Sequence, residues 1–180
     1  MTTYLIASNE MMCRILARRM EGLDIPTPVR WHSPEWLLDD DHAAARVITI
    51  DNPDEAEPVP YGPVDIVLVD CSGVEGDPRV LLDRVHARLA PRRWLVLSDA
   101  LDSTLMVHAA RLGASGCLAV PAPVEQVCAA AALVWAGGQC FPRKALSLLR
   151  AHHPRTTEPA PPLPPLRTQP FHPDGSTAIG

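Results

Sequence analysis

The chain has 180 residues, of which 47% are hydrophobic and 21% are charged, as is ordinary for a soluble globular protein. This length allows one domain with a sizeable core, plus a tail. The formal net charge of -5 argues against a broad, non-specific nucleic-acid surface, which would need an excess of Lys and Arg.

Five short apolar runs along the chain predict β-strands. Each run is continuous rather than alternating, which is typical of parallel strands that are covered on both faces. The predicted strands are Tyr4–Ala7, Arg46–Ile50, Asp65–Val69, Trp94–Ser98 and Cys117–Val120.

Helical patterns lie between and after these runs. The first covers Met12–Met20. In "GDPRVLLDRVHARLAP", Asp77 is a plausible N-cap and Pro78 suits the first helical position. In "LDSTLMVHAARLG" the cap candidates are Asp102 and Ser103, and the final glycine ends the helix. "PVEQVCAAAALVWAGG" predicts a last helix with one apolar stripe, which ends at its glycine pair.

Strands that alternate with helices over short loops predict a doubly wound α/β fold, with a five-stranded parallel sheet and helices on both faces. The functional crevice of such a sheet lies beyond the carboxyl ends of its strands. Asp70 falls at one of these ends, in "DIVLVDCSG". It is either a working carboxylate or a cap of the following turn, a common role for Asp. Its position alone does not decide between the two.

Residues 25–63 form a less regular region, apart from the strand predicted at Arg46–Ile50. "SPEWLLDDDH" predicts a short helix that starts at Ser33, with Pro34 at its first position. "DNPDEAEPVPYGP" is acidic and rich in proline, and is long for a loop in a compact domain. We therefore expect an exposed insertion or an interaction element. Whether this region adds a strand to the edge of the sheet stays open.

Two further segments follow residue 142, and the composition changes sharply after His153. "RKALSLLRAHH" predicts a helical extension over 143–153. Residues 154–180 are rich in proline and cannot bury enough apolar surface to fold, so we expect a disordered or extended tail. Within it, "PPLPPLR" matches a polyproline-II ligand of the PxxPxR kind, a pattern that also arises by chance in such tails.

The cysteines and the N-terminus bear on the compartment. There are five cysteines and no C-x-x-C pair, so we expect reduced thiols packed as small hydrophobes rather than a zinc site or a disulfide framework. The N-terminus lacks the basic region and long apolar core of a signal peptide. No run approaches the ~18–20 apolar residues that a membrane span needs. We expect a cytoplasmic protein without a membrane partner.

Two stretches, "VDIVLVD" and "LMVHAARLGASGCLAVPAPVEQVCAAAALVWAGGQCFP", resemble a known family. The second is similar to the fourth helix, the "GASGYLLKP" strand, the fifth helix and the "GG-x-x-x-P" exit of bacterial response-regulator receiver domains of the NarL/FixJ type. The resemblance covers roughly Thr3–Pro142. It implies a CheY-like, flavodoxin-like fold in the domain 1–142.

The family's chemistry is phosphoryl transfer to an aspartate. It uses an acidic pair that holds Mg²⁺, a hydroxyl residue after the fourth strand and a lysine after the fifth. By this resemblance Asp70 matches the phosphoacceptor and Ser98 the hydroxyl residue. The remaining positions depart from the pattern: Ser8 and Asn9 fall at the acidic pair, with Glu10 one residue away, Val120 replaces the lysine and Cys117 the reporting aromatic.

These departures imply a degenerate receiver. Mg²⁺ requires hard oxygen ligands, and an incoming phosphate is repelled by carboxylates that no cation neutralises. Asp99 adds negative charge where the phosphate would enter. An alternative is that Asp70, Glu10 and Asp99 form a different site for Mg²⁺ or Ca²⁺.

The resemblance also implies an interaction face, made by the fourth helix, the fifth strand and the fifth helix. This face would hold His108, Arg111, Leu112, Leu118, Val127 and Trp135. NarL-type proteins continue into a helix-turn-helix reader of DNA, but here no second helix pair follows. We therefore expect a protein partner or a homodimer and no direct contact with nucleic acid.

The function expected is a phosphorylation-independent regulatory module that acts through protein–protein contact, with no enzymatic activity, no metal and no cofactor. One alternative is a receiver that is phosphorylated on Asp70 with Mg²⁺. Another is a sensor in which the vacated acidic pocket binds a small molecule.

Overall fold

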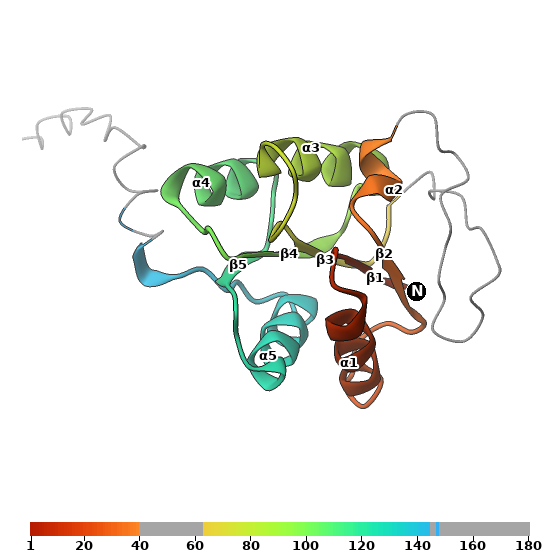
Figure 1. Ribbon diagram of the computed structural model, residues 1–180. Helices are drawn as coiled ribbons and strands as arrows, with labels where there is room; N and C mark the ends of the chain where they lie inside the picture. Colours follow the sequence, from red (N-terminus) through yellow and green to blue (C-terminus); the bar gives the residue numbers. More distant parts are fainter. Residues whose placement is uncertain (40–62, 145–146, 148–180) are drawn as a thin grey trace, which may run out of the picture.

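A computed structural model describes residues 1–39, 63–144 and 147. Its sheet has five strands, all parallel, in the order β2-β1-β3-β4-β5 (Figure 1). The strands are β1 (Thr3–Ile6), β2 (Val29–His32), β3 (Ile66–Asp70), β4 (Arg93–Ser98) and β5 (Gly116–Ala119). The predicted doubly wound, flavodoxin-like fold is confirmed.

Five helices cover the sheet within the described residues. They are α1 (Glu10–Met20), α2 (Glu35–Leu38), α3 (Pro78–Leu89), α4 (Ser103–Arg111) and α5 (Val124–Trp135). Figure 1 shows α1 and α5 on one face of the sheet and α2, α3 and α4 on the other. Both faces are therefore buried, which explains why the strand sequences are apolar without alternation.

Each face of the sheet has its own core. Val67, Val69 and Val96 pack with α2, α3 and α4, around the buried Trp36 and Trp94. The intervening strand residues, among them Leu5, Leu68 and Leu97, pack on the other face with α1 and α5. Successive residues of a strand point to opposite faces, so the same short runs supply both cores.

The predicted helix starts are confirmed at two positions. The side chain of Asp77 accepts a hydrogen bond from the backbone N–H of Arg79, with proline at the first helical position of α3. The side chain of Asp102 accepts from the backbone N–H of Leu105 at 2.7 Å and caps α4. These caps satisfy donors that have no partner within the first turn of a helix.

The second strand corrects the sequence interpretation. The sequence predicts an irregular region over 25–63 apart from a strand at Arg46–Ile50, but β2 lies at Val29–His32 and pairs with β1 at the edge of the sheet. The short helix predicted after Ser33 is confirmed as α2. Arg46–Ile50 itself lies outside the described residues.

The chain after α5 crosses the outer edge of β5. Cys140 forms a parallel bridge with Gly116: the backbone N–H of Cys117 donates to the carbonyl of Cys140 at 2.8 Å, and the N–H of Cys140 donates to Ser115 at 3.1 Å. Phe141 then packs against the core on the α3 and α4 side. The chain itself therefore covers part of this strand edge.

Most of the extension predicted over 143–153, and all of the tail 154–180, lie outside the described residues. The five thiols are free; four are buried and Cys140 is partly exposed. Among the described helices none combines the length and apolar character needed to cross a membrane.

Candidate functional site

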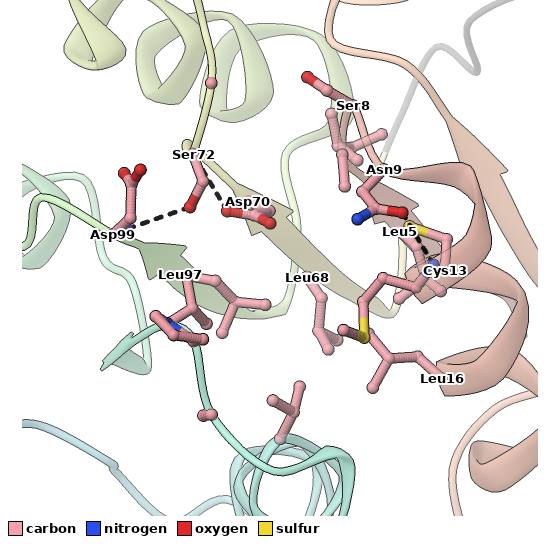
Figure 2. Close-up of a pocket in the computed structure, with 18 of the residues that line it drawn as sticks. Leu5, Ser8, Asn9, Cys13, Leu16, Leu68, Asp70, Ser72, Leu97 and Asp99 are labelled. Atoms are coloured by element: carbon pink, nitrogen blue, oxygen red, sulfur yellow. Dashed lines mark hydrogen bonds between the residues drawn. The ribbon is translucent and has the colours of Figure 1, made fainter.

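Asp70 is the last residue of β3 and stands at the carboxyl edge of the sheet. Its Oδ1 accepts a hydrogen bond from the backbone N–H of Ser72 at 2.9 Å. The hydroxyl of Ser72 accepts in turn from the backbone N–H of Asp99 at 3.0 Å, which ties the loop after β3 to the loop after β4 (Figure 2). Asp70 therefore does cap the turn that follows it.

Ser98, which by the resemblance matches the hydroxyl residue of receivers, is the last residue of β4 and is buried. Its side chain is 2% exposed, and its Oγ accepts a hydrogen bond from the backbone N–H of Ala100 at 3.1 Å. It is absent from the pocket described below. The Ser98 side chain is thus held in the turn after β4 and does not line the pocket, although its backbone carbonyl accepts a hydrogen bond from the N–H of Val120 at 3.0 Å.

The three residues after β1 have different environments. Asn9 is the N-cap of α1, and its Oδ1 accepts from the backbone N–H of Met12 at 3.0 Å. Glu10 pairs with Arg14 one helical turn later, with 2.5 Å between Oε1 and Nη2. Ser8 is exposed. Where the resembling family has its acidic pair, this chain therefore has an exposed hydroxyl and a helix cap, followed by a carboxylate in a solvent-exposed ion pair.

A pocket of about 650 Å³ opens at this edge and extends between α1 and α5 under the sheet. Figure 2 shows Asp70, Ser72 and Asp99 above its apolar part. The predicted site residues in its lining are Ser8, Asn9, Glu10, Asp70, Asp99 and Val120. Seven residues were predicted to form the phosphoacceptor site, and the structure brings six of them together in this lining. The exception is Ser98.

The sequence does not indicate that the apolar part of the pocket is a site. Leu5, Leu68 and Leu97 from three neighbouring strands line it, with Leu16 from α1. Their spacing marks them only as core residues, because a cavity depends on how fully the opposite side chains fill the space. No signal in the sequence distinguishes them from other core leucines.

The electrostatics of the pocket are negative. The charged residues in its lining are Glu10, Asp70 and Asp99, all acidic. Within the described residues, neither Asp70 nor Asp99 makes an ion pair. Burial raises the pKa of the Cys13 thiol to about 12, and the carboxylates of Asp70 and Glu10 add to that shift. At neutral pH this thiol is protonated and forms part of the apolar lining.

The alternative cation site at Asp70, Glu10 and Asp99 is not supported by the geometry. In the described part of the chain, no three His, Cys, Asp or Glu side chains converge as metal ligands would. The three carboxylates line one pocket without forming a common coordination site.

The predicted interaction face needs one correction. Val127 is only 4% exposed, and it packs in the core and lines the pocket, because it lies on the inner side of α5. Arg111 is exposed, whereas Leu112 is partly buried against the α3 and α4 core. Leu118 and Trp135 are partly buried against the opposite core. His108 Nε2 lies 2.8 Å from Asp83 Oδ1 of α3.

Comparison with solved structures shows the fold of response-regulator receiver domains. The isolated receiver domain of RcsB from Salmonella enterica serovar Typhimurium, in the apo form, has a TM-score of 0.54 and 13% identity over 83% of this chain and 98% of that one. The same domain with the phosphomimetic BeF₃⁻ has a TM-score of 0.53 and 12% identity, covering 82% and 97%. The regulatory domain of the master biofilm regulator CsgD has a TM-score of 0.52 and 17% identity, over 84% of this chain and 100% of that one.

The sequence matches no protein-family model and has no significant match among curated proteins. At the identities above, the structural likeness concerns the fold, and the function has to be argued from the site.

Proposed function

We propose that this protein is a receiver-like regulatory module that acts by contact with another protein or with a second copy of itself, without phosphoryl transfer. The observation that carries the proposal is Val120 in the lining of the pocket that also contains Asp70. By resemblance, a receiver has a lysine here, whose ammonium group neutralises the incoming phosphoryl group. A valine side chain cannot supply that charge.

The metal side of the site supports the same proposal. The Asn9 side-chain oxygen already accepts the capping hydrogen bond of α1, and Glu10 already pairs with Arg14. Mg²⁺ favours carboxylate ligands, which Ser8 and Asn9 do not provide. Losing several charge-assisted contacts at ~1.5–3 kcal/mol each should slow phosphorylation by orders of magnitude.

The test is an amide NMR titration of the full chain with Mg²⁺ and then beryllofluoride, which mimics an aspartyl phosphate. We expect no shifts concentrated at Asp70, Ser98 and β5. A saturable response there would overturn the proposal in favour of a receiver that is phosphorylated on Asp70. The control is the triple variant S8D/N9D/V120K, which restores the missing charges. If this variant responds and the natural chain does not, the residues at these three positions explain why the natural chain shows no shifts.

The contact surface we propose is the side of the molecule formed by α4, α5 and the part of the β5 edge that Cys140 leaves open, without Val127. Partly buried apolar groups from both cores lie on these elements: Leu112 packs against one core, and Leu118 and Trp135 pack against the other. The exposed Arg111 is the last residue of α4 and lines a groove with His108 and with Arg79 of α3, so it borders this surface. Apolar and aromatic groups next to an arginine are typical of protein interfaces.

Sedimentation velocity over a range of protein concentrations tests this surface. The variant Arg111→Glu reverses a charge at its border, and Arg18→Glu makes the same change on the exposed side of α1. If the chain self-associates, we expect Arg111→Glu to weaken the dimer and Arg18→Glu to leave it intact. Equal effects of the two substitutions would place the interface elsewhere. A chain that stays monomeric would point to a different protein as the partner.

A further inference from the structure

We propose that the pocket between α1 and α5 binds a small amphipathic molecule with an apolar body and a cationic head, such as a protonated alkylamine. This inference goes beyond the proposed function and does not depend on the identity of the protein partner. Its basis is the combination of an apolar interior with an acidic mouth in one cavity of about 650 Å³. That volume falls in the range of ~300–1,000 Å³ that is usual for small-molecule sites.

The interior selects an apolar body. Leu5, Leu68 and Leu97 line the pocket from the sheet, Leu16 from α1 and Val127 from α5. All five are also members of the core on this side of the sheet. Each of them is at most 4% exposed, so an alkyl chain or ring would lie over them at the floor of the pocket, where it would leave water and replace no hydrogen bonds of the protein.

Small side chains leave the mouth of this pocket open. Ala7 follows β1, and Val120 and Ala122 follow β5, and all three belong to the lining. Val120 stands where the resembling family has a lysine, so a long charged side chain is replaced by a short apolar one. The entrance therefore lacks a residue that would fill it or neutralise it.

The mouth selects a cation. Asp70 and Asp99 line it, and neither has an ion-pair partner among the described residues. Asp70 uses Oδ1 for the turn at Ser72, and no hydrogen bond to its Oδ2 is present in the described part of the chain. An ammonium group at this point would gain charge-assisted hydrogen bonds, whereas a carboxylate or phosphate would be repelled.

A bare metal ion fits less well than an organic cation. Among residues 1–39, 63–144 and 147, no group of three or more His, Cys, Asp or Glu side chains is placed to coordinate a metal. A metal ion would also leave the apolar part of the pocket unused. The ligand that satisfies both parts is a molecule that carries its charge at one end.

The direct test compares octylamine, octanol and octanoate, which share one chain length and differ in the charge of the head. Methylamine serves as the head without the body. Each compound is titrated into the full chain, with amide NMR to locate the site and thermal unfolding to measure stabilisation, since a ligand that prefers the folded state raises its stability. We expect octylamine to bind most tightly, octanol more weakly, and octanoate and methylamine not to bind detectably. The shifts should map to β1, β3 and the N-terminal half of α1.

Two variants and one control test the residues. The double variant D70N/D99N keeps the shape of the mouth. It should weaken the binding of octylamine by roughly tenfold or more and leave the binding of octanol unaffected. Ala122→Trp should fill the pocket and abolish binding of both. Ala129→Trp places the same side chain on the exposed surface of α5, outside the lining, and should leave binding unchanged.

Three outcomes would overturn the proposal. Equal affinity for the amine, the alcohol and the carboxylate would refute selection of a cation. Binding that survives Ala122→Trp, or shifts confined to α1 with none in β1 and β3, would show non-specific association on the surface of α1. No binding of octylamine at millimolar concentration would show that the pocket is not a site for this class of ligand.

Discussion

The side-chain oxygen of Asn9 accepts a hydrogen bond from the backbone N–H of Met12 at 3.0 Å, and this contact starts helix α1. By resemblance to receivers, the same position would carry a carboxylate that binds Mg²⁺. A side chain that caps a helix turns toward the first turn of that helix. The position thus has a structural role here, which can be separated from any role in metal binding.

Replacing Asn9 by alanine should lower the free energy of unfolding by about 1 kcal/mol, because the first turn of α1 loses an acceptor. Asn9→Asp should leave stability nearly unchanged, since aspartate caps equally well and its charge is favourable at a helix N-terminus. Urea unfolding followed by circular dichroism measures both variants, with Ser8→Ala at the neighbouring exposed position as the control. An Asn9→Ala variant as stable as the natural chain would refute the capping role.

Most of the fold could be predicted from the sequence because burial on both faces leaves a strong local signal. The runs that became β1, β3, β4 and β5 are continuous and apolar, and the capping residues Asp77 and Asp102 mark the starts of two helices. These features depend on neighbours along the chain, so they can be recognised without the fold.

The second strand could not be predicted for the opposite reason. "VRWH" contains an arginine and a histidine, and its burial arises from contacts distant in sequence. Trp31 Nε1 donates a hydrogen bond to the carbonyl of Ala7 at 2.8 Å, and the ring of His32 stacks on that of Tyr4. The candidate site also has a part that the sequence predicts and a part that it does not. Its polar residues could be predicted because they directly follow strands, whereas the apolar pocket depends on packing between elements distant in sequence.

His32 is a buried base without a charged partner. Its side chain is 1% exposed, and its ring lies 3.6 Å from that of Trp36 at an interplanar angle of 6°. Neither ring nitrogen has a hydrogen-bond partner among the described residues. Burial, and secondarily the charge of Arg30, lowers the pKa of His32 from 6.5 to about 3. The folded protein therefore holds this imidazole neutral throughout the physiological range.

The stability of the protein should fall as the pH drops below 6.5, because the unfolded chain then takes up a proton that the folded chain does not. Between pH 6.5 and about 3 the slope from His32 approaches 1.4 kcal/mol per pH unit, and above pH 6.5 it vanishes. His32→Phe keeps a stacking ring without the titrating group, so urea unfolding at pH 7.5, 6.5 and 5.5 should show a smaller loss. His86→Gln on the exposed side of α3 is the control. Equal slopes in the natural chain and His32→Phe would contradict the assignment.

The bridge between Gly116 and Cys140 depends on the absence of a side chain at residue 116. A Cβ at this position would overlap the carbonyl oxygen of Cys140 and lie 3.1 Å from its Cβ, so the backbone after α5 would have to move. Gly116→Ala should therefore destabilise the protein by about 1–3 kcal/mol. It should also speed hydrogen exchange at the amide of Cys117, which donates to Cys140 at 2.8 Å. Gly22→Ala, where the nearest atom would lie at 3.7 Å, should change neither measurement, and a Gly116→Ala chain with native exchange at Cys117 would show that the bridge tolerates a side chain.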